Sequence, residues 1–245
     1  MNPGNGQTHL TRAGPLQWRA GSGWLILSGG GSWRENETGE VDATALGWAD
    51  LDRPMAVLPT AGSSTIEAEA LLDYYADLGG PSGYVVPIFD AVGAQLAENC
   101  RLLEEAGLIY ISDGPETVTL VKALGESPAM EALARTFEQG AVVMGAGAGA
   151  AALGAWVVDP QSRRAPTEAT RAEQGLGWLH NVVVDPHFKG TEAAHRLRDL
   201  LSLKPNCLGL GIPDGVGLGL GPSGEVENIG PGQVTVVFSG LDVET

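Results

Sequence analysis

The chain has 245 residues, 43% of them hydrophobic, and a formal net charge of −16. This length is sufficient for one large α/β domain or two small ones with a sizeable core. The acidic balance argues against a general nucleic-acid-binding protein, because phosphate contacts need clustered Lys and Arg side chains. It favours a solvated surface and gives only weak support to a cationic ligand.

Neither a membrane segment nor a metal site is indicated. No apolar run approaches membrane-spanning length, and the N-terminal segment lacks the apolar region of a signal peptide. We therefore expect a cytoplasmic protein without membrane or nucleic-acid partners. Cys100 and Cys207 lie far apart without metal-site spacing, and we interpret both as small buried thiols. We predict no cofactor and no metal.

Short apolar runs alternate with helical patterns from residue 21 onward. Residues 1–20 are polar and rich in Gly and Pro, so we expect a flexible arm, followed by a single domain over residues 21–245. Strands are predicted at 24–27 (WLIL), 55–58 (MAVL), 84–88 (YVVPI) and 108–112 (LIYIS). Helices are predicted at 65–78, 94–106, 117–124 and from 128 to near 139, with capping signals at Ser64 and Ser127.

The first strand runs into a glycine loop, SGGGS at 28–32. Such a loop can cradle a phosphate, but this one lacks the P-loop lysine and the spacing of G-x-G-x-x-G. We therefore interpret it as a turn at the carboxyl end of a strand.

Residues 141–153 (AVVMGAGAGAAAL) read as a strand, an abrupt glycine turn and the start of an alanine-rich helix. Gly145 and Gly149 form the frame of a nucleophile elbow, G-x-S-x-G, in which the central residue sits on a strained turn. The central position should carry serine, but it is Gly147. The sequence therefore presents a hydrolase-type frame without its nucleophile.

Beyond residue 158 the pattern changes. We expect a surface loop at 159–173, a strand at 182–184, a helix at 191–202 and antiparallel hairpins in the Gly-rich tail. The alternation of strands and helices predicts a three-layer α/β sandwich, with a mainly parallel central sheet and helices on both faces. Ligands bind at the carboxyl ends of such strands, where the loops at 29–32, 113–116 and 145–149 would open.

Several ordered motifs together resemble one known family. They are LSGGGS, the DGPE loop, GAGAGA, GLGWL followed by VVVDPHF, and LGLGIPDGVGL. In this order and spacing, from Trp24 on, the chain resembles the cyanophycinase and aspartyl-dipeptidase family of serine peptidases. The resemblance implies a class I glutamine-amidotransferase-like fold and a homodimer.

The resemblance also assigns roles to individual positions. It places the nucleophile at Gly147, the catalytic histidine at His187 and the acid that orients the histidine at Asp214. The G-G-D-Q loop of the family corresponds to residues 113–116. The oxyanion donors would then be the backbone N–H groups of Gly114 and Ala148.

Departures from the family pattern oppose acyl transfer. Glycine has no side-chain oxygen, so no acyl-enzyme can form at position 147. Glu116 replaces the glutamine of the loop and adds a negative charge near the expected oxyanion, and Pro115 reshapes the loop. The arginines of cyanophycin-cleaving members fall on Thr191 and Ala193, and are absent.

Two kinds of group could substitute for the missing nucleophile: another hydroxyl side chain, or a water molecule activated by a metal ion. Ser112 and Thr117 flank the oxyanion loop, but ordinary capping and strand-end roles explain them better. A metal ion could be bound if four residues converged: His187 and Asp214, and the further residues lining the site, Asp185 and Glu116. Their spacing matches no recognised metal motif.

The sequence therefore predicts a non-hydrolytic homologue that binds a peptide-like or amino-acid-derived ligand in the inherited cleft. The alternative is an active serine-type hydrolase on small aspartyl or β-aspartyl peptides, using a substitute nucleophile or activated water. A glycine introduced to trap a substrate is a third interpretation, less consistent because alanine is the usual choice.

Overall fold

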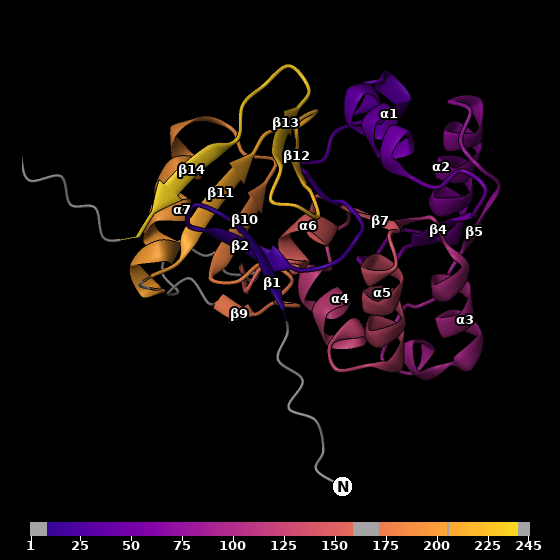
Figure 1. The fold of residues 1–245 in the computed structure, drawn as a ribbon. Coiled ribbons are helices and arrows are strands. Elements are labelled where there is room, and N and C mark those ends of the chain that lie inside the picture. The colour runs from indigo at the N-terminus through magenta and orange to yellow at the C-terminus, as the bar shows by residue number, and fades with distance from the viewer. Residues whose placement is uncertain (1–8, 159–171, 205, 240–245) are drawn as a thin grey trace, which may run out of the picture.

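The computed structural model describes residues 9–158, 172–204 and 206–239, and its largest sheet has seven strands (Figure 1). The five strands from β3 to β5 are parallel, β12 runs antiparallel to β3, and β13 runs antiparallel to β12. The predicted mainly parallel sheet is confirmed, with β5 at its edge. In spatial order the strands are β13 (Val226–Ile229), β12 (Gly217–Leu220), β3 (Leu25–Ser28), β7 (Val142–Ala146), β6 (Leu108–Ile111), β4 (Met55–Leu58) and β5 (Gly83–Val85).

Helices cover both faces of this sheet, because alternate residues of each buried strand point to opposite faces. Leu25 and Leu27 of β3 belong to one buried cluster, and Ile26 belongs to the other. The first cluster includes residues of α3 (Ala97–Glu105), α4 (Thr117–Leu124), α5 (Pro128–Glu138) and α6 (Ala148–Ala152). The second includes residues of α1 (Gly39–Trp48) and α2 (Thr65–Asp77). Figure 1 shows the resulting three layers, with α1 and α2 on one side and α3 to α5 on the other.

A second sheet carries the later part of the chain. Its central strands β10 and β11 are parallel, and α7 (Gly190–Leu203) packs against it through leucines that include Leu197 and Leu201. Its strands are β14 (Thr235–Phe238), β11 (Leu208–Ile212), β10 (Val182–Pro186), β8 (Trp156–Val158) and β9 (Ala172–Gln174). The tail is antiparallel as predicted, but it divides between the sheets. The β12–β13 hairpin joins the first sheet and β14 joins the second. Of the loop predicted at 159–173, residues 159–171 lie outside the described residues and β9 begins at Ala172.

The N-terminal segment differs from the expected flexible arm. Residues 10–19 form a hairpin of β1 (Leu10–Ala13) and β2 (Leu16–Arg19). Trp18 is 1% exposed and bridges to Leu179, and the Arg19 N–H donates to the Trp178 carbonyl at 2.7 Å. Leu16 and Trp18 lie on one buried face of β2, but this alternation covers only four residues of a segment rich in Gly and Pro, too few to predict a strand. Residues 1–8 lie outside the described residues.

Capping signals located two helix starts correctly. Ser64 Oγ accepts from the Glu67 N–H at the start of α2, and Ser127 Oγ accepts from the Met130 N–H at the start of α5. The helix predicted at 94–106 is divided instead. A 3-10 turn, η2 (Gly93–Gln95), precedes the extended residue Leu96, and α3 begins after it.

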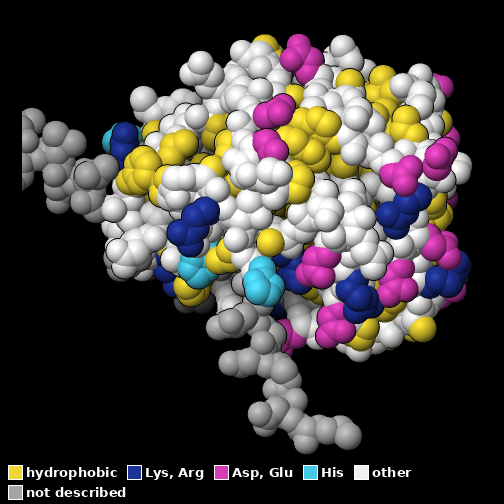
Figure 2. All heavy atoms as spheres, in the orientation of Figure 1, with side chains coloured by type: hydrophobic (Ala, Val, Ile, Leu, Met, Phe, Trp, Pro, Cys, Tyr) yellow, Lys and Arg dark blue, Asp and Glu magenta, His cyan; other side chains and the backbone are white. Residues whose placement is uncertain are grey.

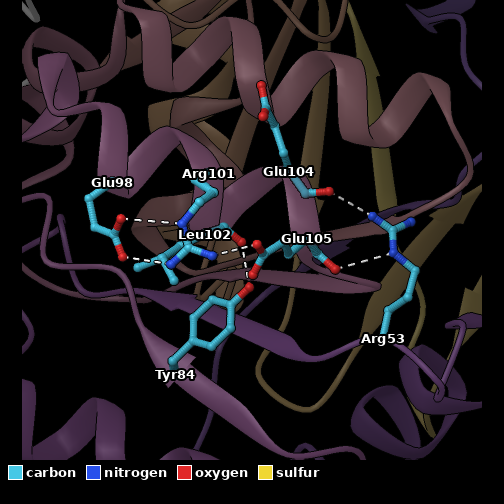
Figure 3. Close-up of polar contacts among 7 residues, drawn as sticks. All are labelled: Arg53, Tyr84, Glu98, Arg101, Leu102, Glu104 and Glu105. Atoms are coloured by element: carbon cyan, nitrogen blue, oxygen red, sulfur yellow. Dashed lines mark hydrogen bonds and ion pairs between the residues drawn. The ribbon is translucent and has the colours of Figure 1, made fainter.

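The edge of the first sheet is tied to α3 by polar contacts at the end of the helix (Figure 3). Arg53 donates to the carbonyls of Glu104 and Glu105 at 2.9 and 3.2 Å, which satisfies carbonyls that the helix leaves free. The Tyr84 hydroxyl of β5 donates to the Leu102 carbonyl. Acidic and basic side chains also alternate over the surface of α3 and α5, where Arg101 and Arg135 make exposed ion pairs (Figure 2). Such pairs contribute little to stability.

Among the described residues, none of the helices is both long enough and apolar enough to cross a membrane.

We predict that the N-terminal hairpin is an integral part of the core. Trp18→Ala removes a fully buried indole and should lower the free energy of unfolding by about 3–5 kcal/mol in a denaturant titration. Arg12→Ala, at an exposed position of the same hairpin, should change it by less than about 0.5 kcal/mol. Equal small effects of the two substitutions would mean that the hairpin is dispensable.

Candidate active site

The carboxyl ends of five strands converge at one place, where loops of the two sheets meet. β3 leads into the glycine loop, and β6 and β7 lead to Asp113 and Gly147. In the second sheet, β10 and β11 lead to His187 and Asp214. Backbone hydrogen bonds join these loops: the Gly147 N–H donates to the Ser28 carbonyl at 3.0 Å, and the His187 N–H donates to the Gly29 carbonyl at 2.9 Å. The loops at the carboxyl ends of these strands therefore lie together, and their role as the functional site stays a prediction.

Gly147 forms the sharp turn between β7 and α6. Its φ of +50° and ψ of −111° belong to a conformation that L side chains rarely adopt. A Cβ at this position would overlap Oδ1 and Cγ of Asp113. Position 147 therefore tolerates only glycine while Asp113 keeps its present place.

The Asp113 carboxylate occupies the space in front of the elbow. Its Oδ1 accepts from the Gly114 N–H at 2.7 Å and from the Ala148 N–H at 2.8 Å. These are the two groups expected to serve as oxyanion donors. Its Oδ2 lies 3.1 Å from His187 Nε2. One carboxylate thus contacts both backbone donors and the histidine.

His187 is held between two acids. Its Nδ1 lies 2.6 Å from Asp214 Oδ1, on the side opposite to Asp113. The residue has a φ of +51°, which is uncommon outside glycine and typical of strained functional positions. Gly30 makes this approach feasible, because a Cβ there would overlap His187 Cε1.

The electrostatics of the three residues favour a protonated histidine. The hydrogen bond to Asp113 is the largest cause that raises the pKa of His187, and with that to Asp214 it outweighs burial, giving a pKa of about 9. Burial raises the pKa of Asp113, but hydrogen bonds from His187 and the backbone N–H groups outweigh it, so this pKa is lowered. At neutral pH an imidazolium therefore lies between two carboxylates. In that state the ring cannot accept a proton from a hydroxyl group.

The remaining residues expected at the site lie further out. Pro115 and Glu116 are exposed, and the Glu116 carboxylate accepts from Thr119 Oγ1 at 2.7 Å. The negative charge at the backbone donors belongs instead to Asp113. Asp185 is 2% exposed and pairs with Arg196 Nη2 of α7 at 2.8 Å. Among the described residues, no cluster of three or more His, Cys, Asp or Glu side chains is arranged to hold a metal ion.

A cavity of about 150 Å³ lies beside Asp113. It extends from the glycine loop to α2, and its lining includes the aromatic residues Trp33 and Tyr110. Ser63 and Ser112 also line it. It is the space next to the elbow that remains open to a small ligand.

Asp113 is the residue that sequence reasoning missed. The sequence predicts that the loop 113–116 lies at the site, but its motif gives no role to the first residue of the loop. A signal was present, because the family pattern has glycine where this chain has Asp113, just as it has serine where this chain has Gly147. Asp113 and Gly147, the two departures from the family pattern, face each other in space, which the sequence alone does not reveal.

We predict that Asp113 and Gly147 are energetically coupled. Gly147→Ala should destabilise the wild type more than it destabilises Asp113→Gly, because only the wild type has a carboxylate in the space of the new methyl group. The coupling measured by chemical denaturation of the four proteins should be about 1–3 kcal/mol. Equal costs in both backgrounds would exclude the steric conflict, since the backbone strain is common to both.

We also predict an elevated pKa for His187. An NMR titration of the imidazole should give a pKa near the value of about 9, and Asp113→Asn should lower it toward the ordinary 6.5. Since the folded pKa is raised, this network stabilises the fold fully below pH 6.5, and its contribution is lost as the pH rises through about 9. The melting temperature should therefore fall as the pH rises from 6.5 to above 9, and it should fall less in Asp113→Asn than in the wild type. Asp77→Asn, with the same charge change on the exposed end of α2, is the matched control, and an unshifted histidine in the wild type would contradict the network.

Comparison with known proteins supports a common origin with peptidases. The chain is 27% identical over 190 residues to a cyanophycinase of Geminocystis herdmanii, covering 76% of this chain and 70% of that protein. It is 29% identical over 191 residues to a cyanophycinase of Synechococcus elongatus, covering 76% of this chain and 59% of that protein.

Solved structures show the same fold. The crystal structure of a peptidase from an acI-B1 Actinobacterium superposes with a TM-score of 0.66 at 24% identity, covering 96% of this chain and 97% of that one. A putative peptidase E protein from Listeria monocytogenes gives a TM-score of 0.57 at 16% identity, covering 88% and 98% of the two chains. The model of Peptidase family S51 matches residues 24–221, and the chain therefore belongs to this family.

Proposed function

We propose that this chain is a non-hydrolytic member of Peptidase family S51 that binds a small peptide-like or amino-acid-derived ligand in the inherited cleft. The observation that carries the proposal is the position of the Asp113 carboxylate. It fills the space that a side chain at position 147 would need, and it accepts hydrogen bonds from both Gly114 and Ala148.

Acyl transfer by a serine peptidase needs three things at once: a nucleophilic oxygen, a neutral histidine and free oxyanion donors. Gly147 provides no oxygen. The pKa of about 9 keeps His187 protonated at neutral pH, so it is poorly suited to act as a base. The oxyanion donors are engaged by Asp113. Each of these features opposes the reaction on its own, and the last two share a cause in Asp113.

Binding does not need any of the three. The cavity beside Asp113 is smaller than most ligand pockets, at about 150 Å³, but its lining combines polar and aromatic residues as small-molecule sites do. The family relationship favours a ligand related to a peptide or an amino acid.

An active hydrolase is the second candidate. The short contact between His187 Nδ1 and Asp214 favours it, because that pair is oriented as a base with its supporting acid. However, Nε2 already contacts Asp113, so a water molecule would have to displace the carboxylate before the histidine could activate it.

The decisive experiment compares the wild type with Gly147→Ser, Asp113→Gly and the double variant, on cyanophycin and on aspartyl and β-aspartyl dipeptides. We expect no turnover by the wild type or by either single variant. Gly147→Ser alone should fail because the new side chain meets the Asp113 carboxylate. If the inherited frame is otherwise intact, the double variant should exceed the wild type by at least about tenfold, because it regains a nucleophile and free oxyanion donors together.

Turnover by the wild type that disappears in His187→Gln would refute the non-hydrolytic proposal and establish the second candidate. An inactive double variant would instead mean that other departures from the family pattern also prevent turnover, namely Pro115, Glu116 and the missing arginines. Circular dichroism of each variant checks that the fold is retained.

A further inference from the structure

The cavity beside Asp113 is small. Its volume of about 150 Å³ is similar to that of engineered cavities that admit benzene, so it has room for roughly six non-hydrogen atoms. It lies at the carboxyl end of β6, which supplies Tyr110 and leads to Ser112 and Asp113, and it reaches α2 at Ala68 and Leu71. Only a small molecule, or one side chain of a larger molecule, fits within it.

Two lining residues have hydroxyl groups whose protons are already donated within the protein, and these groups can only accept from a ligand. Ser63 Oγ donates its proton to the Asp113 carbonyl at 2.8 Å, and Thr38 Oγ1 donates to Asp42 at 2.6 Å. Each hydroxyl has one proton and two lone pairs, so both protons are committed to the protein and the lone pairs remain. Ser112, which is 5% exposed, adds a third hydroxyl oxygen. A ligand that donates hydrogen bonds matches the lone pairs of Thr38 and Ser63, whereas a ligand that only accepts finds no proton on these two groups.

The charges at the cavity are negative overall. Asp113 lines the cavity, whereas His187 and Asp214 lie behind it, outside the lining, and with His187 protonated these three residues together carry one net negative charge. Glu67, also on the wall, is matched by Arg34 at 2.8 Å. Among the described residues, no Lys, Arg or His side chain lines the cavity.

Asp113 retains the capacity for one more bond. A carboxylate offers about four lone-pair sites, and three are used, by two backbone N–H groups and by His187. One acceptor therefore remains on a carboxylate that lines the cavity. A guanidinium group is planar and is best matched by two parallel carboxylate bonds, which Asp113 cannot supply. An ammonium group is compact, has three donors and no acceptor, and matches one carboxylate lone pair together with hydroxyl oxygens.

We propose that this cavity binds the ammonium group of a small primary alkylamine, with Asp113, Ser63 and Ser112 around the cation and the chain against Trp33, Leu71 and Ala68. This inference rests on the proposed function, because it names the ligand class of the same inherited cleft. The amine is the free ligand or the cationic end of an amino-acid derivative, and its ammonium head is the shared feature that is recognised.

The test is an NMR titration of the wild-type chain at about pH 6, where His187 is protonated, with n-butylammonium chloride at constant ionic strength. We expect saturable shifts of the Ser63, Ser112 and Gly114 amides with a Kd on the order of 1 mM, which is reasonable for a ligand of five heavy atoms. n-Butanol and sodium butyrate, which have similar shapes, should bind at least about tenfold more weakly.

Variants distinguish charge recognition from simple filling of space. Asp113→Asn should weaken n-butylammonium at least about fivefold, and Ser112→Val, which removes an acceptor and fills the cavity, should abolish binding. Asp77→Asn makes the same charge change outside the cavity and should leave the Kd unchanged. Retained binding in Ser112→Val would place the amine elsewhere and overturn the proposal.

The control ligands give the other contrary outcomes. Equal affinity for n-butanol would show that the cavity selects shape alone, and tighter binding of butyrate would show an anion site. If n-butylguanidinium bound tenfold more tightly than n-butylammonium, the cavity would be a guanidinium site and the proposal of an ammonium site would be wrong. Absence of amine binding in a preparation without peptidase activity overturns this inference only, whereas turnover by that preparation overturns the proposed function.

Discussion

The site depends on the hydrogen bonds of a single carboxylate. Asp113 accepts from two backbone N–H groups and from a protonated imidazole, and so it has the contacts that a negatively charged reaction intermediate would otherwise make. Its presence raises the pKa of His187, excludes a side chain at position 147 and places an acceptor at the neighbouring cavity. Preorganised donors stabilise whichever anion lies among them, and here that anion is part of the chain.

Most of the fold could be predicted because its signals are local. Buried strands such as Met55–Leu58 are short apolar runs, and the serine caps at Ser64 and Ser127 fix helix starts through a single hydrogen bond each. The N-terminal hairpin was missed because burial of Trp18 depends on a partner more than 150 residues away, at Leu179. The division of the tail between two sheets is likewise decided by pairing over long sequence distances, which local patterns do not contain.

The candidate site shows the same limit. The motifs located His187, Asp214, Gly114 and Ala148 at strand ends, and the structure brings all four around one point. They did not reveal that a fifth residue, from the oxyanion loop itself, enters the space of the absent nucleophile. That result requires the distance between β6 and β7 at their carboxyl ends, a quantity set by sheet geometry. Asp185 illustrates the converse, since it belongs to a predicted motif but its charge is neutralised by Arg196 within the fold.

The mutual exclusion between Asp113 and a side chain at position 147 also orders events in time. From any ancestor with a side chain on the elbow, the aspartate could not have adopted its present position first, because the two groups would overlap. The change to glycine had to precede it or accompany it. Once the carboxylate was in place, a single substitution could no longer restore a side chain on the elbow without an overlap with Asp113. A return to a side-chain nucleophile at position 147 would therefore need changes at both positions, whereas a new ligand for the cleft needs neither.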